Sequence, residues 1–312
     1  MKQNELKLKK RAGAGFLNEL SVNRYLYLLA IPVILYYVLF CYLPMFGIVI
    51  AFKEYNIGLG IIESKWVGLK NFKEFFGSVY FTRLLRNTFA ISIYDLLVGF
   101  PMPIIFALLL NEVKNRLFKK TVQTITYLPH FISMVVICGM IIDFFGTDGI
   151  ITKLMTLFGA ENMNYVGNKD SFRSIYVLTN IWQQIGWNSI IYLSALSGID
   201  QQLYEAASID GAGRFRRLLH VTLPGIMQTI VVMLILRLGQ ILSVGYEKII
   251  LLYSPGTYET ADVISSYVYR MGLQGARYSY STAVGLFQSL INITILFSAN
   301  TVCKKTMHTS LF

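Results

Sequence analysis

Charged residues are scarce in this chain of 312 amino acids: they make up 14% of the sequence, whereas hydrophobic residues make up 54%. A soluble domain usually carries about 25% charged residues. This shortage argues against an ordinary soluble enzyme or binding domain. The apolar residues also come in long runs separated by polar stretches, which is typical of repeated membrane spans.

Acidic residues are fewer than basic ones, and the formal net charge is +11. Such an excess can indicate nucleic-acid binding, but only where Lys and Arg gather into one face with interleaved aromatic residues. Here they flank apolar runs instead, as the positive-inside rule of membrane proteins requires. We therefore expect a membrane protein without a nucleic-acid partner.

Residues that build metal, redox and catalytic sites are also few and scattered. They are Cys41, Cys138 and Cys303, and His130, His220 and His308. The chain has no CxxC pair, no metal-ligand spacing and no GxxxxGK[ST] phosphate loop. No Ser-His-Asp or paired-carboxylate arrangement can be argued from linear spacing. The sequence therefore predicts no metal site, no resident cofactor and no catalytic residue, and the chain is not expected to be an enzyme.

Six apolar runs are long enough to cross a bilayer as helices, which takes about 20 residues each. They cover Tyr25–Phe52, Thr88–Leu110, Thr121–Phe145, Ile175–Leu196, Val221–Ser243 and Ser281–Val302. Helices are favoured over barrel strands because the runs lack alternation of polar and apolar residues. The first run is too long and too aromatic for a cleaved signal peptide. We expect an all-α integral membrane protein with a basic tail (1–24), a six-helix domain (25–303) and a short tail (304–312).

Orientation follows from the distribution of Lys and Arg, which is denser in the tails and in 111–120 and 198–220 than in the alternate loops. Both termini are therefore predicted to be cytoplasmic, in a multi-pass protein of the plasma membrane. The first outer loop, 53–87, mixes aromatic residues with Lys in its part from 66 to 81, which predicts either a short interfacial helix or an ordinary packed loop. Prolines predict kinks or breaks at five positions: Pro32, Pro44, Pro101, Pro103 and Pro129.

The loop between the fourth and fifth runs, 200–220, is the most informative segment. Asp200 is a plausible N-cap for a short helix from about Gln201 to Ile209. Gly211 and Gly213 would end that helix and turn the chain sharply. This pattern predicts a rigid element that another protein can bind and move. A plain re-entry loop with basic anchors fits the pattern as well.

Within this loop, Glu205-Ala206-Ala207, followed by Gly211, Val221 and Leu223-Pro224, resembles the EAA loop of binding-protein-dependent importer permeases. The family pattern is E-A-A-x3-G-x9-I-x-L-P, and only Val221 departs from it. In that family the loop is a coupling helix that docks into a cleft of an ATPase subunit. The resemblance implies the following coupling residues: Tyr204, Glu205, Ala206, Ala207, Asp210, Gly211 and Arg214.

Segments along nearly the whole chain resemble the LplB/YtcP group of sugar permeases, relatives of the maltose permeases. They include 51–56, 66–69, 84–88, 107–113, 127–131 and 267–270. The resemblance implies the MetI-like type I importer fold and an oligosaccharide substrate. It also implies a second permease, either a different chain or a second copy, and two ATPase subunits that hold ATP and Mg. An extracellular solute-binding protein completes the implied assembly.

Polar residues inside the runs are candidates for the substrate path, because such groups are costly in a membrane. Asp95 and Arg237 are expected to face the bundle interior, where they either pair with each other or stay hydrated. In the fourth run one helical face carries Trp182, Gly186 and Ser189, and another carries Gln183, Trp187 and Tyr192. Either face could line a sugar path, with aromatic rings and amides meeting the sugar. The expected path residues are Trp182, Gln183, Trp187, Asn188, Tyr192, Asp95 and Arg237.

Other readings stay open at this point. The two tryptophans fit helix packing and the headgroup belt equally well. An ion-driven secondary transporter would place charged residues near the midplane, for which only Asp95 and Arg237 are candidates. A membrane scaffold without transport activity, or an importer of lipid-linked or peptide cargo, are further alternatives.

Overall fold

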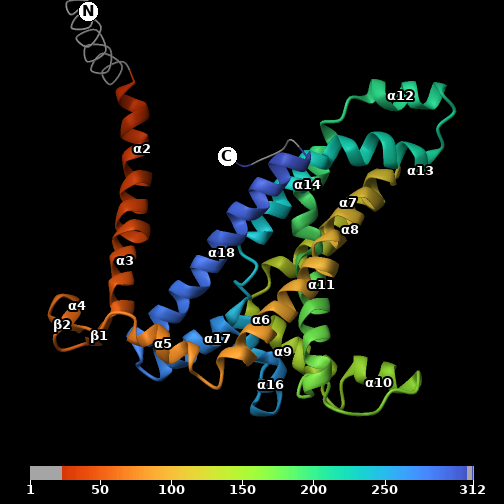
Figure 1. Ribbon diagram of the computed structural model, residues 1–312. Coiled ribbons are helices and arrows are strands. Elements are labelled where there is room, and N and C mark those ends of the chain that lie inside the picture. Colours follow the sequence, from red (N-terminus) through yellow and green to blue (C-terminus); the bar gives the residue numbers. More distant parts are fainter. Residues whose placement is uncertain (1–22, 308–310, 312) are drawn as a thin grey trace, which may run out of the picture.

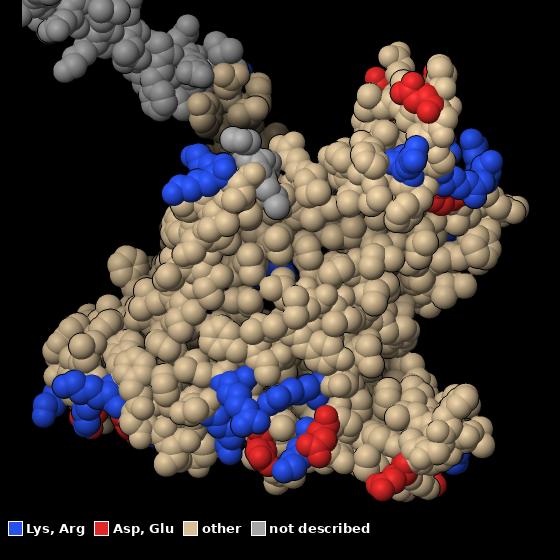
Figure 2. All heavy atoms as spheres, turned by 45° about the vertical axis from the view of Figure 1, so that its right-hand side comes forward, with Lys and Arg blue, Asp and Glu red and all other residues tan. Residues whose placement is uncertain are grey.

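The computed structural model describes residues 23–307 and residue 311. The two expected tails, 1–24 and 304–312, therefore lie partly outside the described residues, as does His308. Charged side chains gather at two opposite ends of the molecule, with a broad uncharged band between them (Figure 2). This distribution is the one expected of a protein that crosses a bilayer.

Long helices form the body of the molecule, and several are built from consecutive segments. These are α2 (Arg24–Tyr37), η1 (Val38–Tyr42), α3 (Leu43–Met45), η2 (Phe46–Phe52), α6 (Phe81–Tyr94), η3 (Asp95–Gly99), α7 (Pro101–Glu112), α8 (Arg116–Tyr127), η4 (Leu128–Phe131), α9 (Met134–Phe145), α11 (Lys169–Ser197), α13 (Arg214–Arg217), η5 (Leu218–Thr222), α14 (Leu223–Leu238) and α18 (Tyr278–Met307).

Within residues 23–307, five helical stretches are both long and apolar enough to cross a membrane: Arg24–Phe52, Phe81–Glu112, Met134–Leu157, Arg214–Leu238 and Tyr278–Thr306. The sixth long helix, α11, has 29 residues and extends about 44 Å. It carries several amides and hydroxyls and is less apolar than the others. With α11 included, the all-α fold agrees with the prediction of about six spanning helices.

The third predicted span is broken rather than continuous. α8 ends at Tyr127, a 3₁₀ turn (η4) carries Pro129, and Ile132 and Ser133 are extended before α9 begins. The Ser133 side chain accepts a hydrogen bond from the N–H of Val136 and so caps the new helix. The apolar run conceals this break because hydropathy does not register a change in backbone conformation.

The fifth span begins and ends earlier than the predicted Val221–Ser243. It begins at Arg214, because the basic residues that precede the apolar run continue the helix. It ends at Leu238, and the apolar residues after it form a turn. Asn292 of α18 accepts a hydrogen bond from the N–H of Leu242 (3.1 Å), and Gln288 donates one to its carbonyl (2.9 Å). These side chains satisfy backbone groups that a continued helix would have satisfied itself.

Three π-helical turns share one position relative to proline. η1, η3 and η5 end at Tyr42, Gly99 and Thr222, two residues before Pro44, Pro101 and Pro224 respectively. A proline inside a helix lacks an N–H and clashes with the carbonyl four residues earlier. Widening the preceding turn by one residue relieves that clash, which explains why the helices continue past these prolines.

Short elements gather at the ends of the long helices. They are β1 (Lys53–Asn56), α4 (Gly60–Glu63), β2 (Ser64–Trp66), α5 (Lys70–Phe76), α10 (Ile150–Leu157), α12 (Gln201–Ile209), α15 (Tyr246–Leu252), η6 (Pro255–Thr257), α16 (Tyr258–Ala261), α17 (Ile264–Tyr269) and η7 (Arg270–Gln274). β1 and β2 form an antiparallel hairpin in which Lys53 pairs with Trp66. Within loop 66–81, α5 packs its fully buried Phe75 against α18, so this part of the loop is packed against the bundle.

The two ends of the molecule differ in content. α12, the start of α2 and the end of α18 lie at one end, whereas the β-hairpin, α10 and α16 lie at the other (Figure 1). α11 runs between the two ends and packs against α7, α8 and α14. α2 stands apart from this bundle, and none of its residues is buried. Its exposed apolar surface therefore requires lipid or another protein.

Candidate functional site

A pair of opposite charges lies inside the helix bundle. Asp95 is on η3 and is 6% exposed, and Arg237 in the last turn of α14 forms an ion pair with it. The amide of Asn180 donates a further hydrogen bond to the Asp95 carboxylate, with an N···O distance of 3.0 Å. The pairing expected from the sequence is therefore present, and a buried carboxylate with such partners is tolerated where an isolated one would not be.

This pair lines a cavity of about 680 Å³ between α6, η3, α11, α14 and the segment from Gln240 to Lys248. A volume of this size falls within the range of about 300–1,000 Å³ found for ligand sites. Its polar lining residues are Ser92, Asp95, Tyr176, Asn180, Gln184, Asn188, Tyr192, Arg237, Gln240, Ser243, Tyr246, Glu247 and Lys248. Amides and charges that converge on such a space suit a polar ligand.

One face of α11 supplies the amides. Asn180, Gln184 and Asn188 follow each other at four-residue spacing and therefore lie on the same side of the helix. Gly186 packs against α8, where a Cβ atom would lie 2.2 Å from the carbonyl oxygen of Thr126. Because glycine allows this close approach, the amide face of α11 is left facing the cavity.

The α11 residues expected from the sequence to line the substrate path are thus only partly represented in the lining. Asn188 and Tyr192 line the cavity, but Trp182, Gln183 and Trp187 do not. Gln183 is buried at 3% exposure, and Trp182 is 44% exposed. Trp187 stacks on the His130 ring, with centroids 4.3 Å apart. Helical spacing defined the faces of α11, but it could not show which face its neighbours cover.

Three residues that line the cavity were not predicted from the sequence: Asn180, Gln184 and Lys248. Asn180 and Gln184 lie on a face between the two that were considered. Lys248 on α15 is 2% exposed and lies in a segment expected to be an outer loop. A lysine beside a short apolar run is ordinarily read as a membrane anchor. Its burial follows from the packing of α15 against α9 and α17, which the sequence does not show.

The loop between α11 and α14 has the local structure expected from its sequence. Asp200 caps α12 by accepting a hydrogen bond from the N–H of Gln202 (2.9 Å), and α12 runs from Gln201 to Ile209. Gly211 adopts a φ of +74°, a conformation that side chains with a Cβ rarely adopt. The chain then reverses direction, and α13 begins at Arg214.

The expected coupling residues fall into two groups by exposure. Glu205, Ala206, Asp210, Gly211 and Arg214 are exposed, whereas Tyr204 and Ala207 are partly buried. The exposed surface also has apolar side chains that were not predicted: Leu203, Ile209 and Phe215 are 54%, 86% and 71% exposed. Exposed apolar and charged groups at a projecting loop form a surface suited to binding another protein.

Two hydrogen bonds connect α12 to the helix that leads into the bundle. The Tyr204 hydroxyl is hydrogen-bonded to Thr222 Oγ1 at 3.0 Å. Arg217 donates to the Ser208 hydroxyl at 3.0 Å. Thr222 and Arg217 precede α14 in one continuous helix, Arg214–Leu238, so these two bonds attach α12 to the helix that carries Arg237.

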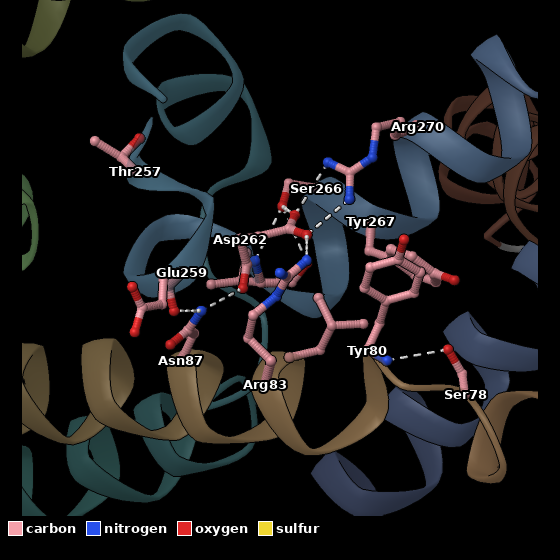
Figure 3. Close-up of polar contacts among 12 residues, drawn as sticks. Ser78, Tyr80, Arg83, Asn87, Thr257, Glu259, Asp262, Ser266, Tyr267 and Arg270 are labelled. Atoms are coloured by element: carbon pink, nitrogen blue, oxygen red, sulfur yellow. Dashed lines mark hydrogen bonds and ion pairs between the residues drawn. The ribbon is translucent and has the colours of Figure 1, made fainter. Parts of the chain in front are cut away.

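At the opposite end, a buried carboxylate connects several helices (Figure 3). Asp262 is fully buried and accepts hydrogen bonds from Arg270 (2.7 and 3.2 Å) and Ser266 (2.9 Å), and Arg83 approaches it at 3.4 Å. Asn87 of α6 donates to the carbonyl oxygen of Asp262 (2.9 Å). These contacts fix the end of α6 against the segment from α16 to η7.

Arg173 of α11 joins this cluster by donating to the Asn87 side chain (2.7 Å). Nearby, the ammonium of Lys169 lies 3.0 Å from Glu259 and, through that hydrogen bond, holds the pKa of the carboxyl group below its ordinary value. The network therefore includes α6, α11, α16 and α17. It holds these helices together at the end of the molecule opposite α12.

Comparisons with known proteins agree with this architecture. The family model described as "Binding-protein-dependent transport system inner membrane component" matches residues 99–306. Protein LplB of Bacillus subtilis (strain 168) is 46% identical over 301 residues, covering 96% of this chain and 95% of that protein. The polygalacturonan/rhamnogalacturonan transport system permease protein YteP of the same organism is 45% identical, covering 95% of this chain and 93% of its own length.

Solved structures show the same fold. A chain of a bacterial ABC transporter involved in the import of the acidic polysaccharide alginate is 42% identical and has a TM-score of 0.85, covering 93% of this chain and 99% of its own. A chain of a bacterial alginate ABC transporter in complex with an alginate pentasaccharide-bound periplasmic protein has a TM-score of 0.86. The chain therefore belongs to the family of binding-protein-dependent transport system inner membrane components.

Proposed function

We propose that this chain is the permease subunit of an ATP-driven, solute-binding-protein-dependent importer of oligosaccharides, and that it forms half of the translocation pore. The names of the similar proteins support the cargo class, since they include a polygalacturonan and an alginate transporter. The observation that carries the proposal is the projecting α12, connected by Tyr204 and Arg217 to the helix that bears Arg237.

In this proposal an ATPase subunit binds α12 through its exposed residues, among them Glu205, Ile209 and Arg214. When ATP draws two ATPase subunits together, α12 moves with one of them. The motion reaches α14 through η5 and repositions Arg237 at the cavity. The bundle then exchanges between inward-facing and outward-facing states, a population shift driven by ATP binding and reset by hydrolysis.

The same proposal assigns a partner to each exposed part of the chain. The solute-binding protein docks at the end that holds the β-hairpin, α10 and α16. A second permease, a different chain or a second copy, completes the pore. ATP and Mg belong to the ATPase subunits, and this chain has neither catalytic residues nor a cofactor of its own. Both termini and α12 face the cytoplasm, and the chain resides in the plasma membrane.

The test is a charge reversal on α12 in the reconstituted importer. We expect Glu205→Lys to lower ATP-dependent oligosaccharide uptake at least tenfold, because the docking surface loses a carboxylate and gains a like charge against a basic partner. The control is Glu63→Lys, which reverses an exposed carboxylate on α4 at the opposite end and should leave ATPase docking unchanged.

The same experiment separates the alternatives. An ion-driven transporter would import without ATPase subunits, and a scaffold would show no uptake in the unmodified protein. Unchanged uptake and unchanged ATPase binding in Glu205→Lys, with normal assembly, would contradict the proposed coupling.

A further inference from the structure

Lys248 is a buried cation without an acidic partner. It is one of the residues that line the cavity, and it is 2% exposed. The ammonium donates to the carbonyl oxygen of Tyr176 at 3.3 Å and lies 5.1 Å from the centre of the Tyr176 ring. Among residues 23–307, no carboxylate oxygen lies within 4.0 Å of it.

These contacts leave the lysine charge incompletely compensated. An ammonium has three N–H donors, and one hydrogen bond to a neutral carbonyl uses only one of them. The aromatic face adds a weak attraction. Burying a charged group without a counter-ion is unfavourable, and buried charges in proteins are generally paired with an opposite charge.

The acids of the same cavity do not supply that charge. Asp95 is bound by Arg237 and Asn180. Glu247, the other acidic lining residue, is exposed, and the Tyr246 hydroxyl lies 3.5 Å from its carboxylate. The interior of the cavity thus has two cations and one carboxylate, and that carboxylate is already paired.

The neighbours of Lys248 suit the rest of a sugar. The amides of Asn180, Gln184, Asn188 and Gln240 line the same space and can donate to and accept from hydroxyl groups. An uncharged sugar would satisfy the amides but would leave the ammonium without a counter-ion. A sugar acid would satisfy both, because its carboxylate accepts charge-assisted hydrogen bonds from an ammonium.

We infer that the cavity recognises anionic oligosaccharides made of uronic acids, and that Lys248 binds a substrate carboxylate during passage. This inference rests on the proposed function and narrows its substrate class. It also assigns a specificity-determining role to a residue outside the long membrane helices.

The test uses the complete importer in liposomes and two probes of equal length. One is a galacturonate trisaccharide, and the other is the same trisaccharide with its carboxyl groups reduced to alcohols. Uptake is measured with binding protein saturated by each probe, so that the selectivity reported is that of the membrane subunits. Four proteins are compared: the unmodified chain, Lys248→Met, Lys248→Arg and Lys120→Gln. Lys120 is exposed on α8, outside the cavity, and its replacement is the matched control.

We expect Lys248→Met to lower galacturonate uptake about ten- to hundredfold, the equivalent of one charged hydrogen bond. Uptake of the reduced probe should stay within twofold. Lys248→Arg should retain most of the uptake, and Lys120→Gln should match the unmodified chain. Equal losses for both probes, or unchanged galacturonate uptake in an assembled Lys248→Met importer, would overturn the inference.

A measurement on the unmodified importer tests the inference without depending on whether any variant folds. Preference for galacturonate over the reduced probe supports the inference, and equal or inverse preference overturns it while leaving the proposed function intact. Failure of the unmodified importer to carry either probe or any neutral oligosaccharide with ATP would instead contradict the proposed function itself.

Discussion

At the scale of single residues, the Asp95–Arg237 pair could be predicted and Lys248 could not. Asp95 and Arg237 each interrupt an apolar run, and a charge in such a place needs a partner inside the bundle. Lys248 lies just after a span and looks like an ordinary anchor in the sequence. Its burial results from how α15 packs, which depends on residues far away in the chain.

The ion pair yields a prediction about stability. Asp95→Asn leaves Arg237 without its counter-ion, and breaking a buried pair usually costs 3–5 kcal/mol. Because the Arg237 side chain is 41% exposed, we expect a smaller loss of about 1–3 kcal/mol. Thermal unfolding of the purified complex measures it, and Asp95→Asn combined with Arg237→Gln should be less destabilised than the sum of the single variants. Strictly additive effects would show that the pair contributes no coupling.

At the scale of elements, the α12 loop was predicted almost residue by residue because its signals are local. The cap at Asp200 and the turn at Gly211 depend on neighbouring backbone groups alone. The break at Pro129 and the lining face of α11 depend on contacts between distant segments. A proline could predict a distortion of the third span, but not the 3₁₀ turn and capped restart that replace it.

The connection of α12 to α14 can be tested by removing one oxygen. Tyr204→Phe deletes the hydrogen bond to Thr222 without changing the ring, a loss of about 0.5–1.5 kcal/mol. We expect fewer oligosaccharides to be imported per ATP hydrolysed, because a given movement of α12 then displaces α14 less. The control variant is Tyr42→Phe, which removes the hydroxyl group of an exposed tyrosine on η1. The same import ratio in both variants would show that this hydrogen bond does not transmit motion.

At the scale of the whole molecule, composition and hydropathy predicted the class of fold because a bilayer imposes one simple requirement on every span. Composition and hydropathy did not predict which residues pack together at the two ends of the molecule. In the Asp262 cluster, residues of α17 and η7 meet Arg83 of α6, which lies 179 positions before Asp262 in the sequence (Figure 3). Nor could they show that α2 stands apart from the bundle, so that its surface is left for lipid or another subunit.

The central claim is that α12 projects into the cytoplasm, where an ATP-hydrolysing subunit can bind and displace it. The most direct measurement labels a single cysteine at Ala206 with a membrane-impermeant maleimide, after replacement of the three natural cysteines. Ile62→Cys, 89% exposed on α4 at the other end, is the reciprocal control. The account predicts that Ala206→Cys reacts in inside-out vesicles alone and Ile62→Cys in right-side-out vesicles alone. Labelling of Ala206→Cys from the outside would contradict it.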